Sequence, residues 1–221
     1  MQDKVVTAPY SVREELAHSV THGIGTLLSA AGLLMLVRYS VRHGDGWHIA
    51  TSCIYGISLV GLFTSSTLYH SVTIPRLKHV LRRLDHAAIF VLIAGTYTPF
   101  ALVIVGGGWG WALFGAVWAI AIAGIAMELG MKKRFENVSV TLYLGLGWLG
   151  IIAIEPLAAN LAPGGLMLLL SGGVLYSVGV IFYVWKTLLY HHAIWHLFVL
   201  AGSAAHFFAI LLFVIPDRAV L

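Results

Sequence analysis

Seven long apolar stretches dominate this chain, and none of them contains Asp, Glu, Lys or Arg. An α-helix rises about 1.5 Å per residue, so about 20 residues are enough to cross roughly 30 Å of hydrocarbon. All seven stretches are close to that length. The sequence therefore predicts an all-α bundle of seven transmembrane helices, with spans at residues 16–37, 49–70, 86–105, 109–127, 138–154, 164–185 and 193–215.

The composition excludes the main soluble classes of protein. Hydrophobic residues make up 59% of the 221 residues and charged residues only 10%, whereas soluble domains have about 45–50% and about 25%. The apolar stretches are continuous rather than alternating, which is typical of transmembrane helices and not of transmembrane β-strands. We therefore expect a single membrane domain over residues 1–221, with no nucleic-acid partner despite the net charge of +4.

The basic residues fall mainly on one side of the predicted membrane. Ten of the 13 Lys and Arg residues lie before the first span or between the second and third, fourth and fifth, and sixth and seventh spans. The other side holds three, namely Arg38, Arg42 and Arg218. Because cytoplasmic loops carry the excess of Lys and Arg in multi-span proteins, we expect a cytoplasmic N-terminus and an external C-terminus.

Several polar residues lie inside or at the edge of the predicted spans. Ionisable residues in such places usually face the bundle interior or a cavity, and each is a candidate functional residue. Ser66 and His70 close the second span, Asp85 precedes the third, and His192 and His196 open the seventh. Because the second span ends at the cytoplasmic face and the third and seventh begin there, all five residues are expected at the same face.

The histidine spacing predicts a metal site. His192 and His196 are one helical turn apart, which places both imidazoles on one helix face at a spacing typical of metal ligands. Together with His70 they supply three neutral imidazoles from two helices. Three imidazoles with a fourth position left to water are typical of a catalytic zinc centre. Asp85 is then near enough to act on that water.

Each of these residues also has a simpler interpretation. His70 can reach the headgroups from the end of its helix, and His192 and His196 can be a pair that only begins the last helix. Asp85 suits an N-cap of the third helix, because the helix dipole favours an acidic residue there. Ser66 can be a small packing residue whose hydroxyl bonds back to the carbonyl four residues earlier.

A second polar cluster lies at the start of the first span. Glu15, His18 and His22 fall on one helical face and form either a rival metal site or a second shell around the first one. An acidic residue here is also explained by the preference of acidic side chains for a helix N-terminus. His206 lies ten residues beyond His196 and hence about 15 Å deeper, where we expect a buried hydrogen-bonded residue or part of a polar cavity.

Five short motifs occur in one order along the chain, and together they resemble the bacterial hemolysin III family. That family belongs to the progestin and adipoQ receptor group, within a superfamily that includes the alkaline ceramidases. The resemblance covers residues from about 11 to 215 and rests on all the motifs together rather than on any one. They are Glu14-Glu15 with Thr21-His22-Gly23-Ile24-Gly25, Ser66-Thr67-Leu68-Tyr69-His70, Asp85-His86-Ala87-Ala88-Ile89, Ala94-Gly95-Thr96-Tyr97-Thr98-Pro99-Phe100 and His192-Ala193-Ile194-Trp195-His196.

The resemblance implies a seven-helix bundle in the bacterial inner membrane, with a cytoplasmic N-terminus and a zinc ion near the cytoplasmic side. The family motifs correspond to Ser66, His70, Asp85, His192 and His196, with zinc held by the three histidines. Relatives in the superfamily hydrolyse lipid amides, and others act as membrane sensors or receptors. The bacterial members are linked to membrane lipid homeostasis and, by name, to haemolysis.

One departure from the family pattern concerns the first helix. Similar bacterial sequences usually have Asn where this chain has His18. The departure leaves open whether this helix contributes a metal ligand, or a protonatable group, that relatives lack.

The residues and the resemblance together predict a zinc-dependent hydrolase. Water activated by zinc would attack an amide or ester carbonyl of a membrane lipid. Asp85 would accept the proton and return it to the leaving amine, while Ser66 orients the water or the developing oxyanion. The lipid would enter sideways between helices.

Two other functions are compatible with the same pattern. A membrane sensor or receptor-like protein would use zinc structurally, to tie the second and seventh helices together. A pore-forming haemolysin is disfavoured, because a seven-span bundle with ten inward basic residues is suited to insertion by the cell that makes it. The clustered histidines fit the enzyme and the sensor equally well.

Overall fold

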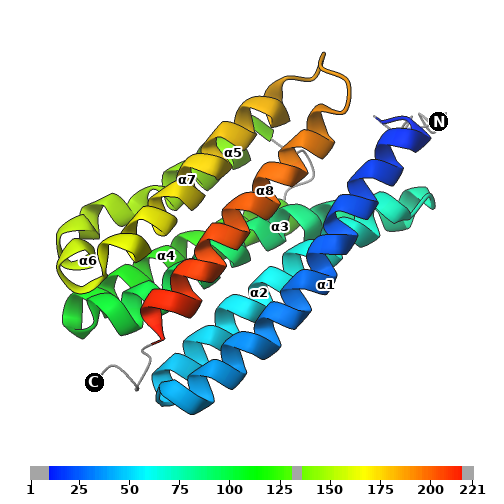
Figure 1. Cartoon of the computed structure of the whole chain (residues 1–221). Helices are drawn as coiled ribbons and strands as arrows, with labels where there is room; N and C mark the ends of the chain where they lie inside the picture. The colour runs from blue at the N-terminus through cyan, green and yellow to red at the C-terminus, as the bar shows by residue number, and fades with distance from the viewer. Residues whose placement is uncertain (1–9, 131–135, 216–221) are drawn as a thin grey trace.

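The computed structural model describes residues 10–130 and 136–215 (Figure 1). Within these ranges the chain is almost entirely helical, without a strand, and seven segments are long and apolar enough to cross a membrane. The predicted all-α, seven-helix membrane fold is therefore confirmed. The segments are Val12–His43, Gly46–Ser71, Pro75–Val105, Gly107–Gly130, Asn137–Asn160, Pro163–Val184 and His191–Val214.

The seven segments differ in how regular their helices are. The first, second, fourth and sixth are continuous α-helices, the third and seventh end in π-helical turns, and the fifth is broken in the middle. In chain order the elements are α1 (Val12–His43), α2 (Gly46–Ser71), α3 (Pro75–Pro99), η1 (Phe100–Val105), α4 (Gly107–Gly130), α5 (Glu136–Gly147), η2 (Leu149–Ala153), α6 (Ile154–Asn160), α7 (Pro163–Val184), α8 (His191–Ala209) and η3 (Ile210–Val214).

The helices extend beyond the predicted spans where the chain is polar, and α3 shows this most clearly. It begins at Pro75 rather than near residue 86, with Ile74 as its N-cap. Proline is tolerated at this position because the first turn of a helix needs no N–H donor. The four basic residues between 76 and 83 therefore lie on the helix. Asp85 is inside α3, so its interpretation as the N-cap of the third helix is wrong.

Side-chain caps define where α1 and α2 begin. The Ser11 hydroxyl accepts a hydrogen bond from the Glu14 N–H, and the Glu14 carboxylate accepts one from the Ser11 N–H at 2.9 Å. This reciprocal arrangement satisfies two donors that a helix N-terminus leaves without partners. Asp45 caps α2 by accepting from the N–H groups of Trp47 and His48. Its hydrogen bond with the His48 ring lowers the pKa of the Asp45 carboxyl.

The fifth span is interrupted at Trp148, although the sequence predicts one helix over residues 138–154. Backbone groups released by such a break must find partners inside the protein, because hydrocarbon offers none. Tyr97 of α3 supplies them: its hydroxyl donates to the Gly147 carbonyl at 2.8 Å and accepts from the Gly150 N–H at 2.6 Å. One side chain therefore stabilises the irregular backbone that continues into α6.

The helices form a ring that is closed by its first and last members. Neighbours in the sequence pack together in the pairs α1–α2, α2–α3, α3–α4 and α7–α8, and α8 also packs against α1. Figure 1 shows α8 lying between α7 and α1. Packing of α8 on α1 brings together residues that lie far apart in the sequence.

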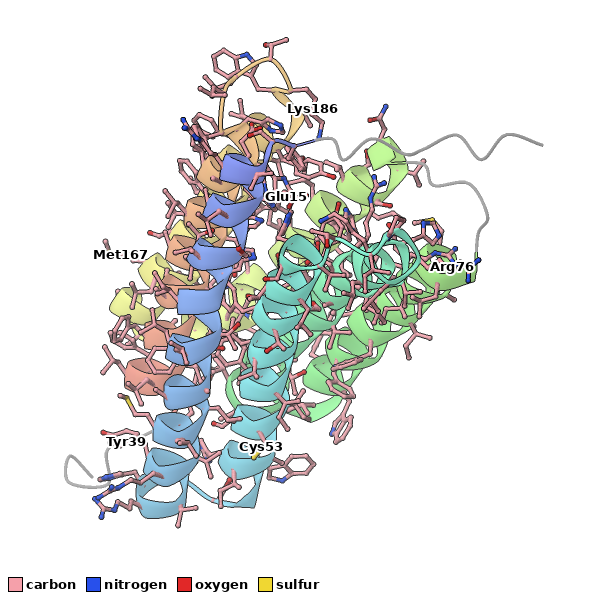
Figure 2. The ribbon with its side chains drawn as sticks, turned by 90° about the vertical axis from the view of Figure 1, so that its right-hand side faces the viewer. Glu15, Tyr39, Cys53, Arg76, Met167 and Lys186 are labelled. Atoms are coloured by element: carbon pink, nitrogen blue, oxygen red, sulfur yellow. The ribbon has the colours of Figure 1, made fainter. Side chains whose placement is uncertain are left out.

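The described charged residues agree with the predicted division between the two ends of the bundle. Lys186 and Glu15 lie at one end, and Tyr39 and Cys53 lie at the other (Figure 2). The basic residues of the first turns of α3 share the end of Lys186, because α3 begins where α2 has returned to that end. Five basic residues used in the sequence argument lie outside the described residues: Lys4, Lys132, Lys133, Arg134 and Arg218.

Glycine allows the closest helix approaches. A Cβ atom at Gly110, in the first turn of α4, would overlap the backbone carbonyl oxygen of Ala101 in η1. A Cβ at Gly25 of α1 would meet the buried ring of Phe63 on α2 at 2.6 Å. Small residues are favoured at such contacts in membranes, because van der Waals packing replaces the hydrophobic drive between helices.

Substitution of Gly110 by alanine is expected to destabilise the bundle by about 1–3 kcal/mol, because the added methyl overpacks a contact with rigid backbone. The matched control is Gly115→Ala on the same helix, where a Cβ meets nothing within 4 Å. Heating both variants in detergent and measuring the fraction that stays monodisperse checks this. Equal thermal stability of the two variants would contradict the packing argument.

Candidate metal centre

Three histidines converge at one end of the bundle. His70 is in the last turn of α2, and His192 and His196 are in the first two turns of α8. All three side chains are buried, and one potential ligand nitrogen from each lies within 4.8 Å of the others. Because α2 ends at the same level where α8 begins, the two helices bring together residues more than a hundred positions apart.

The hydrogen bonds of these rings leave lone pairs for a ligand. Nδ1 of His70 lies 2.6 Å from the Glu15 carboxylate, and Nδ1 of His196 lies 3.2 Å from the His18 carbonyl oxygen. These oxygens only accept, so each Nδ1 carries the proton and each Nε2 is a bare acceptor. Among the described residues, His70 Nε2 and His192 Nδ1 are buried without a hydrogen-bond partner.

Buried polar atoms in proteins are normally paired, so unpartnered imidazole nitrogens need an explanation. A metal ion supplies one, because imidazole is a common ligand of zinc and of other transition metals. A metal-bound histidine usually donates its second N–H to a carboxylate or carbonyl, which is what His70 and His196 do. The residues present therefore fit a metal ion.

Glu15 of α1 contacts side chains of both α2 and α3 next to the histidines. One carboxylate oxygen accepts from the His70 ring, and the other lies 2.9 Å from the ammonium of Lys78 on α3. Lys78 also donates to the carbonyl oxygens of Tyr69 and Val72 at the end of α2. Lys78 was not predicted as a site residue, because nothing in its spacing marks it among the basic residues of α3.

The other two residues of the predicted cluster on the first helix, His18 and His22, contact different members of the histidine group. His18 is fully buried, and its ring packs edge-on against His70 and His192. Glu15, His18 and His70 also form a second group with potential ligand atoms within 4.8 Å of one another. His22 stacks in parallel on His196, with ring centroids 3.5 Å apart and an interplanar angle of 9°.

Ser66 is linked to the histidines through His22. Its hydroxyl lies 2.7 Å from Nδ1 of that ring, a bond that joins α1 and α2. The hydroxyl is therefore bonded across the helix interface. Asp85 is buried on α3, with a carboxylate oxygen 3.7 Å from Nδ1 of His86.

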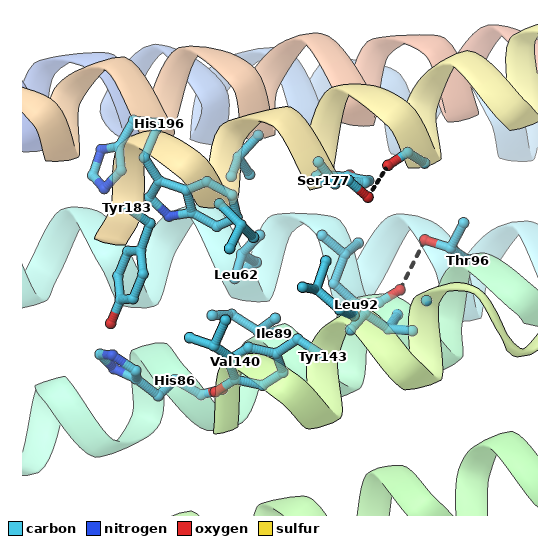
Figure 3. Close-up of a pocket in the computed structure, with 18 of the residues that line it drawn as sticks. Leu62, His86, Ile89, Leu92, Thr96, Val140, Tyr143, Ser177, Tyr183 and His196 are labelled. Carbon is cyan, nitrogen blue, oxygen red and sulfur yellow. Dashed lines mark hydrogen bonds between the residues drawn. The ribbon is translucent and has the colours of Figure 1, made fainter. Parts of the chain in front are cut away.

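A cavity of about 140 Å³ begins at this cluster and runs into the bundle. Ser66, Asp85, His192 and His196 line one end of it, and His206 lines it as well. Figure 3 shows His196 on one side of the cavity and His86 on the other, with Tyr183 between them. Its walls are mainly apolar, with Leu62, Ile89, Ile93, Val140, Leu144, Val180 and Val199 among the lining residues.

Two aromatic or imidazole residues complete the surroundings. His206 is buried, and its Nε2 donates to the Leu169 carbonyl of α7 at 3.0 Å, so it is both hydrogen-bonded and part of the cavity wall. Tyr10, just before α1, stacks on His192 with ring centroids 5.2 Å apart and also contacts His18. Sequence reasoning missed Tyr10, since a residue outside a helix has no periodicity that would place it.

The fold and the cluster define an integral membrane protein with seven spans and a histidine-rich candidate metal centre at one end. The family model described as "Haemolysin-III related" matches residues 10–207. The chain therefore belongs to the haemolysin III-related family.

Individual relatives agree with this assignment over almost their full length. The chain is 48% identical over 204 residues to "Hemolysin-3 homolog" of Bacillus subtilis (strain 168), covering 92% of this chain and 96% of the relative. It is 45% identical over 219 residues to "Hemolysin-3" of Bacillus cereus, covering 99% and 100%. It is also 28% identical over 203 residues to human "Monocyte to macrophage differentiation factor", covering 89% and 83%. This last similarity supports the progestin and adipoQ receptor grouping.

The Glu15–Lys78 contact is expected to couple α1 to α3 even without metal. In a double-mutant cycle in chelator, Glu15→Gln and Lys78→Met should show a coupling energy of about 0.5–3 kcal/mol. Unfolding by SDS titration in mixed micelles measures it. Arg82→Met, which removes another basic side chain of α3, is the control and should combine additively with Glu15→Gln. Additivity of the first pair as well would contradict the contact.

Proposed function

We propose that this protein is a zinc-dependent hydrolase of amide or ester bonds in membrane lipids. One observation carries the proposal: three imidazoles with available lone pairs cluster beside one end of an apolar cavity, and two of them line that end together with a buried carboxylate and a hydroxyl. Metal ligands, an acid–base group and a hydrogen-bond donor are the parts that hydrolysis requires. Family membership supports the proposal, because the motif residues are the ones that converge here.

We propose zinc as the metal. Neutral imidazoles suit zinc, copper, iron and nickel, and zinc commonly binds three protein nitrogens with a fourth position left open. The cluster of His70, His192 and His196 offers nitrogen ligands and no thiolate, since the single cysteine, Cys53, lies at the opposite end of the bundle (Figure 2).

The protein's own residues would transfer the proton and stabilise the developing negative charge. Bound zinc supplies a Lewis acid and lowers the pKa of water to about 7. Asp85 accepts the proton of the attacking water and returns it to the leaving amine or alcohol. Ser66, held by His22, donates its hydroxyl hydrogen to the oxygen on which negative charge develops. Apolar walls exclude bulk water, which strengthens these electrostatic interactions.

The cavity favours a lipid as substrate. Its apolar lining suits an acyl chain, and it runs from His196 to His206, ten residues or about 15 Å along α8. Several lining residues of α5 and α7, such as Tyr143, Leu144, Ser177 and Val180, are partly exposed. We infer that the lipid enters sideways between these two helices.

The proposed location is the inner membrane of a bacterium, with the candidate centre on the cytoplasmic side. The bias of basic residues toward the end that carries the histidines supports this orientation, because translocation disfavours Lys and Arg. The substrate would then come from the cytoplasmic leaflet. Membrane lipids are accordingly the proposed partners.

Purified wild-type protein is expected to contain about one zinc ion per chain, since three imidazoles with bare nitrogens form a zinc site. His70→Ala and the double variant His192→Ala/His196→Ala should both lose it. Elemental analysis after chelator-free purification checks this, with Cys53→Ala as a control that keeps zinc. Zinc retained in both histidine variants would exclude a site shared by α2 and α8.

Asp85→Asn is expected to lower hydrolysis of an identified lipid substrate by about 10²–10⁴-fold, because the amide cannot accept the proton. Zinc content should stay at the wild-type level. Mass spectrometry of lipids in reconstituted vesicles measures turnover. Full activity of the zinc-loaded variant would remove the general-base role, and absence of turnover by the zinc-loaded wild type across lipid amides and esters would favour a sensor with structural zinc.

A further inference from the structure

His18 is the buried residue of α1 that the proposed chemistry does not use. Its side chain is fully buried, and neither ring nitrogen has a hydrogen-bond partner within the described part of the chain. A neutral imidazole carries one donor and one acceptor. Burying a polar group without a partner is destabilising, and the carboxylate oxygen Oε2 of Glu15 lies 3.8 Å from Nδ1 of His18, beyond hydrogen-bond distance. The unpartnered ring therefore indicates a ligand.

The His18 ring lies at similar distances from the rings of the three candidate metal ligands, although its nitrogens are within 4.8 Å of ligand atoms of Glu15 and His70 and not of all three histidines at once. Its centroid lies 4.7 Å from that of His70, 4.8 Å from that of His192 and 5.4 Å from that of His196. The three separations among those ligands are 5.2, 5.2 and 4.6 Å. All six separations therefore fall between 4.6 and 5.4 Å.

Four imidazoles around one zinc ion require this spacing. With Zn–N at about 2.0–2.1 Å and the ring centroid about 1.2 Å beyond the nitrogen, each centroid lies about 3.2 Å from the ion. At tetrahedral angles, centroids at that radius are about 5.2 Å apart. His22 does not meet the requirement, since its ring lies parallel to His196 at 3.5 Å.

A second ion held by Glu15, His18 and His70 is the rival arrangement. The Glu15 carboxylate that it would use already accepts from Nδ1 of His70 at 2.6 Å, and its other oxygen lies 2.9 Å from the ammonium of Lys78. An ammonium beside a metal ligand repels a second cation. One shared ion uses the unpartnered Nε2 of His70 and disturbs neither contact.

We propose that His18 is a fourth imidazole ligand of the ion held by His70, His192 and His196. The inference rests on the metal centre of the proposed function and not on the hydrolysis. With His18 the ion would have four protein ligands, so water or a lipid carbonyl would have to bind as a fifth ligand or displace one of the rings. The first helix of the bundle is thereby tied to the second and the last.

The first test is metal affinity, measured by competition with a chelator on the full-length protein in detergent. His18→Asn should weaken Zn²⁺ and Co²⁺ binding by at least about 100-fold, because loss of a direct ligand exceeds the loss seen for outer contacts. His206→Asn is the matched control: it removes another buried histidine with an unpartnered Nδ1, far from the cluster. Its affinity should stay close to that of the wild type.

The second test looks for a new absorption band rather than for a loss of metal affinity. In Co²⁺-loaded His18→Cys, a thiolate at position 18 should produce a sulfur-to-cobalt charge-transfer band in the near ultraviolet. The wild type should lack this band, since Cys53 is at the opposite end of the bundle. Circular dichroism and size-exclusion chromatography establish that each variant is folded.

The outcomes separate the two proposals. One ion per chain, weaker binding in His18→Asn and the new band in His18→Cys support the fourth ligand. Unchanged affinity in His18→Asn together with no band in His18→Cys overturns it and leaves the three-histidine centre in place. Two ions in the wild type and one in His18→Asn assign His18 to a second ion. Absence of metal binding in the wild type overturns the centre itself.

Discussion

The packing of α8 against α1 is the contact on which the histidine cluster depends. These helices come from opposite ends of the sequence, and their contact closes the ring of helices. It is also polar, since Nδ1 of His196 lies 3.1 Å from the Thr21 hydroxyl and 3.2 Å from the His18 carbonyl oxygen. Hydrocarbon tolerates imidazoles only where the protein provides partners. The same contact therefore stabilises the ring and orients a candidate ligand.

A second set of polar contacts holds the interrupted fifth span beside the cavity. The break in the fifth span would expose backbone groups to lipid, and the Tyr97 hydroxyl satisfies two of them from α3. Next to the break, the Trp148 indole donates to the Ser177 hydroxyl of α7 at 2.9 Å, and both residues line the cavity. The interrupted span is thus bonded to both α3 and α7, and residues of all three segments line the cavity.

The sequence predicts what depends on apolar patterning and helical spacing. The seven spans are recognisable because hydrocarbon thickness sets their length, and the i, i+4 pair His192 and His196 shares a face because helix geometry requires it. Contacts between helices are harder to predict from the sequence. Nothing local links Glu15 to Lys78, since their approach depends on how α1 and α3 pack. The start of α3 was misplaced because hydropathy marks the edge of the hydrocarbon and not the end of the helix.

The geometry around the cluster also fixes the side from which an exchangeable ligand approaches. His192 and His196 border the cavity together with Ser66 and Asp85, whereas His18 and His70 are not among the described residues that line it. Tyr10 stacks over the cluster and contacts both His18 and His70. In the proposed function a reactant would therefore approach from the cavity, which Asp85 lines from α3. The proposed fourth imidazole, His18, is therefore on the side of the cluster away from the cavity.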